Sequence, residues 1–153
     1  TTDSMMTIDV AKYVTEAASE AEVSYPSASI SVETPPAVEA KVHEAFEVAL
    51  TELVNNAVKH GGERPSVHLS VSLDDELDAV IVRVADNGPG IPGLERQSVT
   101  AGEESPLQHA NGLGLWFVRW MATNSGGSFR IKDNKPSGSV IELRFLRSDA
   151  NSS

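Results

Sequence analysis

Three short segments constrain the fold of this chain more than any other feature. They are ELVNNAVKH at residues 52–60, DNGPGIP at residues 86–92 and NGLGL at residues 111–115. Each segment alone is a weak signal, because polar helix faces and glycine-containing turns are common in proteins. Their order and their spacing, within about 65 residues, predict a fold that brings all three into one pocket.

The first segment ends a long amphipathic helix pattern. Four polar side chains fall within roughly one quadrant of such a helix, at about 100° per residue. They are Glu52, Asn56, Lys59 and His60. An apolar stripe beside them, suited to packing on a sheet, consists of Phe46, Leu50, Leu53 and Ala57. The pattern therefore places the polar quadrant at a cleft beside the sheet, although a solvated helix face is an equally good interpretation of this segment alone.

The polar quadrant has the chemistry of a site for Mg²⁺ and phosphate. Mg²⁺ prefers oxygen ligands and keeps several waters, so the amide oxygen of Asn56 together with phosphate oxygens suffices to hold it. Lys59 is suited to neutralising phosphate charge. Glu52, one turn earlier, is suited to orienting or deprotonating a water or hydroxyl group.

The second segment follows a strand pattern. Residues 79–86 (AVIVRVAD) alternate as in a half-buried strand, and the glycines that follow favour a turn. A carboxylate that faces a cavity at a strand end accepts a hydrogen bond from the exocyclic amino group of adenine, whereas guanine presents a carbonyl there. Asp86 is thus a candidate for adenine selection, and Gly88 and Gly90 allow close approach of the backbone. The alternative is an ordinary hairpin turn, in which Asp-Asn-Gly is common.

The third segment opens another helix pattern. Gly112 and Gly114 precede WFVRWMATN, and the helix is expected to end near Gly126. Unobstructed backbone amides at a helix N-terminus form an anion site. The alternative here is a flexible glycine-containing loop.

Taken together, the segments resemble the N, G1 and G2 boxes of the GHKL ATPase family, which unites DNA gyrase B, Hsp90, sensor histidine kinases and MutL. Asn56 with Lys59 and His60 is similar to the histidine-kinase form of the N box, and NGLGLWFV to that of the G2 box. The resemblance extends over roughly residues 8–146. It implies an α+β Bergerat fold, which is a two-layer α/β sandwich with a mixed sheet and three helices on one face.

The resemblance also implies the ligands ATP and Mg²⁺ and a set of site residues. The implied catalytic residues are Glu52, Asn56 and Lys59, with Asn56 as the metal ligand. The implied nucleotide-binding residues are Asn56, Lys59, His60, Asp86, Gly88, Gly90, Ile91, Gly112, Leu113, Gly114, Leu115 and Ser139. Gly138-Ser139 matches the pair that supports the adenine-binding Asp in the family. Two departures are Ala110, in place of the first G2 glycine, and the lack of a phenylalanine-bearing F box between Gly93 and Gln108.

The implied function is that of the catalytic ATP-binding domain of a sensor histidine kinase. Such a domain transfers the γ-phosphoryl group of ATP to a histidine on a separate helical hairpin, which also forms the dimer and passes the signal to a response regulator. No hairpin pattern precedes Asp9, so this partner domain is expected elsewhere in cis or in trans. One alternative is a serine kinase resembling anti-sigma factors, favoured by Glu52. The other is a non-enzymatic nucleotide sensor.

Charge and composition narrow the partners. The formal net charge of −10 disfavours a nucleic-acid-binding surface. No apolar run approaches the 18 or so residues of a membrane helix, so no direct membrane contact and a cytoplasmic location are expected. The chain has no cysteine and hence no disulfide. The acidic surface would suit a salt-rich cytosol, and we therefore expect a halophilic source.

One continuous domain is predicted over residues 8–146. Residues 1–7 are predicted to be a disordered or vector-derived start and residues 147–153 a disordered tail. Asp9 is expected to cap a helix that runs to about Ala21, and Thr34-Pro35-Pro36 to start the long helix that carries Asn56. Residues 93–110 are predicted to form a mobile lid. Strands are expected at residues 27–33, 66–73 and 78–86, followed by a hairpin of residues 128–132 and 139–145.

Overall fold

One mixed sheet forms the base of the fold. The computed structural model describes residues 4–88 and 113–148, and within these the sheet has seven strands. The strands are β1 (Met5–Asp9), β2 (Ser29–Glu33), β3 (Glu39–His43), β4 (Ser66–Asp74), β5 (Ala79–Asp86), β6 (Ser128–Asp133) and β7 (Ser139–Arg147). Their order is β1-β3-β7-β5-β4-β2, with β6 also paired to β7. β2 runs parallel to β4, and the other pairs among these strands are antiparallel.

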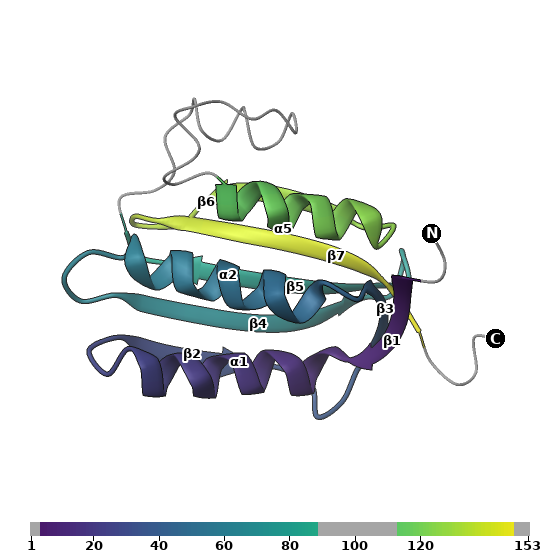
Figure 1. Cartoon of the computed structure of the whole chain (residues 1–153), viewed down its shortest axis with the longest axis horizontal. Coiled ribbons are helices and arrows are strands. Elements are labelled where there is room, and N and C mark those ends of the chain that lie inside the picture. The colour runs from purple at the N-terminus through teal and green to yellow at the C-terminus, as the bar shows by residue number, and fades with distance from the viewer. Residues whose placement is uncertain (1–3, 89–112, 149–153) are drawn as a thin grey trace.

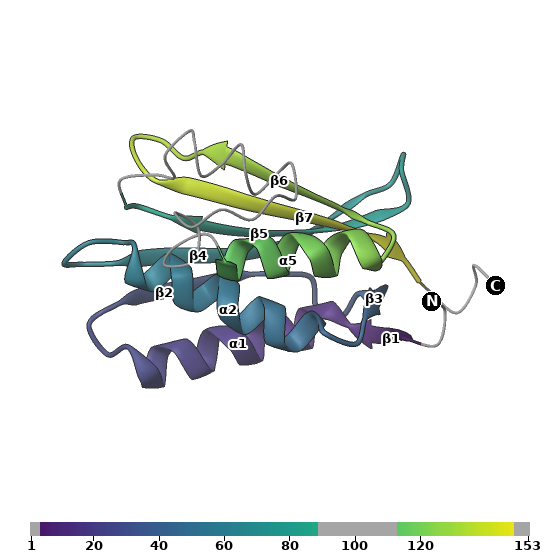
Figure 2. The ribbon, with the colours of Figure 1, turned by 45° about the horizontal axis from the view of Figure 1, so that its top comes forward.

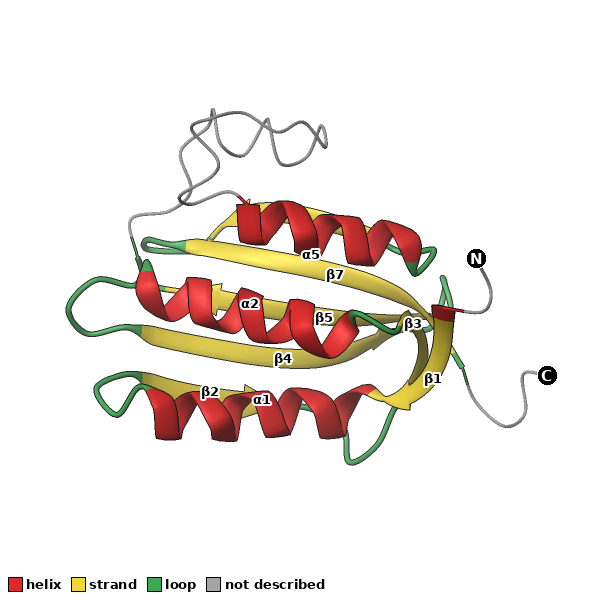
Figure 3. Cartoon of the chain, viewed as in Figure 1, coloured by secondary structure: helices red, strands yellow, loops and turns green. Residues whose placement is uncertain are grey.

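Three helices in the described part of the chain cover one face of this sheet (Figures 1 and 2). They are α1 (Val10–Ser24), α2 (Phe46–Lys59) and α5 (Leu113–Asn124). α2 lies between the other two, and the colouring by secondary structure in Figure 3 separates the helical layer from the strands behind it. The predicted two-layer α/β sandwich with three helices on one face of a mixed sheet is therefore confirmed.

The core lies between the two layers. The predicted apolar stripe of α2 is confirmed, because Phe46, Leu50 and Leu53 are almost fully buried. Alternate residues of the central strands meet them, and the ring of Phe46 packs edge-on against that of Phe145 at 5.4 Å between centroids. Since α2 buries its apolar stripe against the sheet, its polar quadrant is directed away from the core.

The start of α1 is set by its N-cap. Asp9 accepts a hydrogen bond from the backbone N–H of Ala11 through Oδ1 at 3.1 Å, as predicted. The same oxygen accepts the N–H of Val38 at 3.1 Å, which ties the approach to β3 to the helix start. α1 ends at Ser24, about one turn later than predicted.

The prediction of a helix from Thr34 onward was wrong. Residues 39–43 form β3, and α2 begins only at Phe46. In EAKVH, alternate residues Ala40 and Val42 are completely buried, which requires a strand period of two. The predicted helix would have included both His43 and Asn56. In the structure, His43 instead ends strand β3.

The predicted disordered start was also wrong for part of its length. Residues 5–7 belong to β1, which pairs with β3 in the register Met5↔His43 to Asp9↔Glu39. β1 is stabilised by this non-local pairing, so its order depends on β3 being a strand. At the C-terminal end, β7 continues to Arg147. Residues 1–3 and 149–153, at the two ends of the chain, lie outside the described residues.

No helix in the described ranges combines the length and the apolar character needed to cross a bilayer.

Candidate functional site

The polar quadrant of α2 carries an unused polar atom. The side-chain nitrogen of Asn56 is buried and has no hydrogen-bond partner. Such atoms are rare in folded proteins, and each requires an explanation. An amide exchanges its nitrogen and oxygen by a half-turn of the side chain, so this position also presents an oxygen ligand. Asn56 is therefore free to bind something that is not part of the fold.

The third segment lies directly against this part of α2. A Cβ atom on Gly114 would come within 2.7 Å of Asn56 Nδ2 and 3.1 Å of Glu52 Oε2. Both distances are shorter than ordinary van der Waals contacts. The absence of a side chain at residue 114 thus lets the first turn of α5 approach Glu52 and Asn56 without displacing their side chains.

The second segment meets the C-terminal end of the same helix. A Cβ atom on Gly88 would overlap the carbonyl oxygen of His60, the residue that follows α2. Glycine is therefore required where the end of β5 passes the end of α2. The three segments are thus brought together around the last two turns of α2, as their spacing predicted.

Asp86 ends β5 and is held in place by backbone groups. Its Oδ1 accepts the N–H of Gly88 at 2.9 Å and, at a longer 3.4 Å, the N–H of Ser139. Burial raises the pKa of this carboxyl above its ordinary value, although the two hydrogen bonds and the nearby His60 act in the opposite direction. Both of these backbone hydrogen bonds are to Oδ1, and Oδ2 accepts none from the described residues.

The loop between β6 and β7 surrounds the end of β5. Gly138 has a φ of +101°, and a Cβ atom there would overlap the carbonyl oxygen of Asp86. Asn134 Nδ2 donates to that carbonyl at 2.8 Å, and Ser137 Oγ donates to the carbonyl of Asn87 at 3.1 Å. Sequence reasoning missed Asn134 and Ser137, for which the turn-forming composition DNKPSG was the available signal.

The remaining predicted residues are placed less directly. Lys59 is exposed on the last turn of α2, and Leu115 is buried in the core. Ser139 begins β7 with its hydroxyl buried and without a hydrogen-bond partner. Leu113 begins α5, whereas the predicted lid and the residues Gly90, Ile91 and Gly112 lie outside the described residues.

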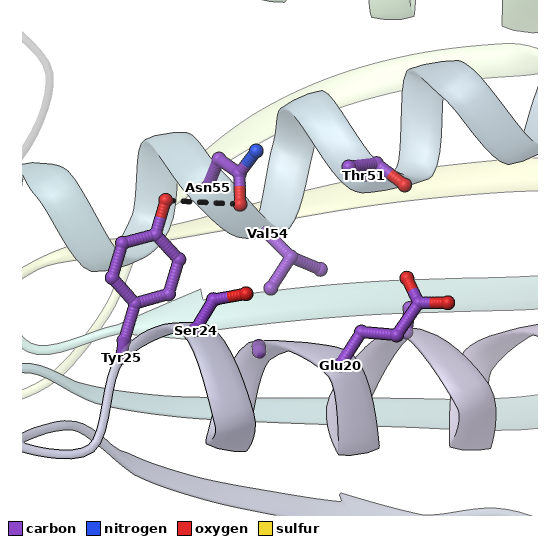
Figure 4. A pocket seen from close by; sticks show the side chains of 8 residues that line it. Glu20, Ser24, Tyr25, Thr51, Val54 and Asn55 are labelled. Atoms are coloured by element: carbon purple, nitrogen blue, oxygen red, sulfur yellow. Dashed lines mark hydrogen bonds between the residues drawn. The ribbon is translucent and has the colours of Figure 1, made fainter.

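A separate pocket of about 160 Å³ lies between α1 and α2 (Figure 4). Glu20 and Ser24 line it from α1, Thr51 and Asn55 from α2, and the hydroxyl of Tyr25 donates to Asn55 Oδ1 at 3.2 Å. None of the predicted site residues lines this pocket. It is therefore distinct from the site formed by the three segments.

The site combines three chemical capacities. Asp86 offers an acceptor for an amino group. The N-terminus of α5 carries the positive end of the helix dipole, which favours an anion. Glu52 and Asn56 place a carboxylate beside an amide. Within residues 4–88 and 113–148, no cluster of three or more His, Cys, Asp or Glu side chains is suited to holding a metal ion. A divalent cation at this site would thus need oxygen atoms from a ligand in addition to Asn56.

Comparisons with known proteins agree with this geometry. Residues 41–149 match the family model of histidine kinase-, DNA gyrase B-, and HSP90-like ATPases. The sensor-type histidine kinase PrrB of Mycobacterium leprae is 31% identical over 149 residues, which are 95% of this chain and 33% of that protein. The histidine-protein kinase AfsQ2 of Streptomyces coelicolor is 34% identical over 105 residues, 65% of this chain and 19% of that protein. The chain thus spans a third or less of these relatives.

Solved structures are similar over nearly the whole chain. The ATP-binding domain of PrrB from Mycobacterium tuberculosis has a TM-score of 0.77 and 28% identity, covering 96% of this chain and all of that one. The catalytic domain of the histidine kinase ThkA has a TM-score of 0.79 and 20% identity, covering 94% of this chain and 97% of that one. The latter likeness concerns the fold alone.

Proposed function

Since the chain belongs to the family of histidine kinase-, DNA gyrase B-, and HSP90-like ATPases, as its three segments predicted, we propose that this site binds Mg–ATP and delivers its γ-phosphoryl group to a histidine of another domain. The domain type is the catalytic ATP-binding domain of sensor histidine kinases. The matches do not favour the serine kinase or the non-enzymatic sensor. The observation that carries the proposal is the convergence of the three segments, through Gly114 and Gly88, on the end of α2.

Asp86 recognises adenine in this proposal. Its Oδ2 accepts a hydrogen bond from the exocyclic amino group of the base, while Oδ1 stays bound to backbone N–H groups of the protein. Guanine would present a carbonyl oxygen to the same carboxylate, and two acceptors repel each other. The buried hydroxyl of Ser139, which has no partner in the fold, is available to the base or to an ordered water molecule.

The triphosphate lies between α5 and α2 in this proposal. Backbone amides at the start of α5, including that of Gly114, donate to phosphate oxygens. Lys59, on the last turn of α2, supplies a positive charge near the phosphates. Asn56 would hold Mg²⁺ through its amide oxygen, because a half-turn of the amide places that oxygen at the unpartnered buried position. Bound Mg²⁺ neutralises charge on the phosphates during transfer.

Glu52 completes the reaction site. It is one turn before Asn56, and both side chains lie close to Gly114. A carboxylate at this place can accept a hydrogen bond from the incoming imidazole and orient its free nitrogen towards the γ-phosphorus. The P–O bond to ADP then breaks as the P–N bond to histidine forms, and ADP leaves. Most of the rate enhancement in such transfers comes from positioning and charge neutralisation.

The test compares two neighbouring asparagines. Asn56→Ala should abolish Mg²⁺-dependent ATP binding and phosphotransfer, whereas Asn55→Ala, which removes the hydrogen bond from Tyr25, should retain both. Binding is measured by calorimetric titration with ATP and GTP, with and without Mg²⁺, in concentrated KCl. Transfer is measured as acid-labile phosphate on an added phosphoacceptor hairpin. Normal turnover by Asn56→Ala, or equal binding of GTP, would contradict the proposal.

For the whole protein we propose further partners. A phosphoacceptor hairpin, in cis or in trans, supplies the histidine and the dimer interface, and a response regulator receives the phosphoryl group. Because Mg–ATP is a cytoplasmic substrate, this domain acts in the cytoplasm. Its reaction requires neither nucleic acid nor direct membrane contact. Phosphate that is acid-stable and located on serine would instead support the anti-sigma-factor-like alternative.

A further inference from the structure

Basic side chains gather on one part of the sheet face that the helices leave uncovered, over β5, β6 and β7. Strand register places Ser70, Arg83, Glu142 and Arg130 in one row across β4, β5, β7 and β6. Directly opposed residues of antiparallel strands share a face of the sheet. This row alternates with the core-facing row of Leu69, Val84, Ile141 and Ile131. Since the three helices cover one face of the sheet (Figure 2), the row lies on the opposite face.

Glu142 lies at the centre of this row and is completely buried, with an exposed fraction of 0%. Its Oε2 accepts from Arg83 Nε at 2.9 Å and from Lys132 Nζ at 3.2 Å, and its Oε1 accepts from Arg144 Nε at 3.3 Å. Burial alone would raise the pKa of Glu142, but the hydrogen bond from Lys132 and the charge of Arg83 lower it below its ordinary value. Three basic side chains are therefore held in fixed positions around one carboxylate.

We define the basic face by Arg83, Arg130, Lys132 and Arg144. Glu142 forms ion pairs with three of these residues, and Asp74 accepts from Arg144 Nη1 at 3.2 Å. The four positive charges of the basic face outnumber the carboxylates of Glu142 and Asp74, on a chain whose formal net charge is −10. The side chains remain accessible, since those of Arg83 and Lys132 are 36% and 49% exposed.

Apolar groups lie beside these charges. Ile81 is opposite Arg144 in the register and is only 5% exposed, although no helix covers this face. Long basic side chains with apolar stems account for such burial. At the far end of β7, Leu146 lies on the same face and is 53% exposed. A surface with paired guanidinium groups and an exposed leucine has the composition of a protein-binding surface.

We propose that the basic face is a docking surface for a folded protein partner that presents a compact cluster of carboxylates. Guanidinium groups bind carboxylates with directional hydrogen bonds, and Glu142 keeps Arg83 and Arg144 ordered before the partner arrives. The four basic residues come from three adjacent strands, which span only about 10 Å. An extended polyanion such as nucleic acid or an anionic membrane would reach beyond this area and be repelled by the acidic remainder of the chain.

The position of the basic face has a consequence for regulation. The candidate nucleotide site lies among α2, α5 and the ends of β5 and β7, on the helical side of the sheet. A partner bound to the opposite side would leave the nucleotide site open. The proposal does not depend on nucleotide binding, and the two are tested separately.

The first test uses a fluorescein-labelled hexaglutamate peptide as the probe and measures its anisotropy at low ionic strength. The double variant Arg130→Gln/Lys132→Gln removes two exposed charges, and the matched control Lys12→Gln/Arg64→Gln removes two exposed charges elsewhere. Each exposed charge pair contributes a factor of about three, so the first variant should bind about tenfold more weakly and the control within about twofold of the original. Urea unfolding verifies that both variants fold.

The second test locates the peptide. Amide chemical-shift changes should concentrate on β5, β6 and β7 and should persist when ADP is bound. Three results would overturn the proposal: no binding at low salt, an equal loss in the control, or shift changes confined to residues 52–60 that ADP abolishes. Tighter binding of a thymidine oligonucleotide or of phosphatidylglycerol vesicles would refute the choice of a protein partner. Loss of ADP binding with peptide binding intact would contradict the proposed function instead.

Discussion

Replacing Asp86 with asparagine would separate nucleotide recognition from fold stability. The substitution preserves the shape of the side chain and an oxygen at Oδ1, so the hydrogen bonds from the N–H groups of Gly88 and Ser139 can remain. The second oxygen becomes an NH₂ group, which then faces the amino group of adenine, donor against donor. Losing a hydrogen bond to a charged group costs about 1.5–3 kcal/mol, and an unpaired donor costs about 1–3 kcal/mol more. The affinity for ATP should therefore fall about 10²- to 10⁴-fold.

The same substitution should not destabilise the fold. Burial raises the pKa of Asp86, so the folded chain holds this proton more tightly than the unfolded chain does. The free energy of unfolding therefore decreases as the pH rises from 3.8, the ordinary pKa of Asp, through the raised pKa of the folded state. Above that folded-state pKa, Asp86 is ionised and the loss of stability is complete. A neutral asparagine removes the loss. The free energy of unfolding at pH 7 should be equal to or above that of the original chain.

Two assays test this reasoning together. Calorimetric titration with Mg–ADP measures the affinity, and urea unfolding at pH 7 and at pH 4 measures the stability. Asp75→Asn, the same chemical change at a carboxylate that is 87% exposed, is the control and should alter neither quantity. ADP affinity of Asp86→Asn within about threefold of the original would refute the adenine contact, and a stability loss above about 1 kcal/mol would refute the pKa argument.

Four other outcomes are expected. Gly114→Ala should keep the fold, since alanine favours a helix over glycine by up to about 1 kcal/mol. The added methyl group should displace Asn56 and lower the affinity for Mg–ATP at least about tenfold. An unchanged affinity in calorimetric titration would contradict this contact. Glu142→Gln should lower the unfolding free energy by about 1–3 kcal/mol in urea at pH 7. Because the folded-state pKa of Glu142 is lowered, the difference in unfolding free energy between the two chains should be largest above pH 4.5 and should vanish as the pH falls through the folded-state pKa. A difference that does not change with pH would argue against the charge contacts. Asp9→Ala should cost about 1–2 kcal/mol in the same assay, because it removes both the cap and the tie to Val38, and no loss would mean that water replaces the carboxylate. Thermal unfolding should shift upward between dilute and molar KCl as screening reduces repulsion in a chain of net charge −10, and an unchanged midpoint would remove the halophilic hypothesis.

Local sequence patterns were sufficient for the features that depend on neighbouring residues. The period of 3.6 placed the apolar stripe of α2 towards the sheet and Asn56 away from it, and Asp9 was identified as an N-cap. The alternation of AVIVRVAD placed Asp86 at the end of a strand. In each case the determining interaction acts within a few residues, so the chain need not be folded for the pattern to be visible.

Non-local pairing defeated the same reasoning in two places. Thr34-Pro35-Pro36 followed by Ala, Val, Glu, Ala and Lys favours a helix start locally, yet residues 39–43 form a strand because β1 and β7 bind to its two edges. β1 in turn is ordered by β3. Neither pairing has a signal within a window of a few residues, so tertiary contacts override local propensity here.

The sequence by itself determined the three segments, the period of each central helix and strand, and hence the family. Only the tertiary structure decided that Gly88 and Gly114 lie against the last turns of α2 and its C-cap, that the β6–β7 loop contacts the end of β5, and that three basic residues bind Glu142. These features depend on strand order and register, which join residues far apart in the sequence, such as Arg83 and Glu142, separated by 59 positions. A linear pattern records which residue types are present, whereas packing of the sheet decides which of them meet.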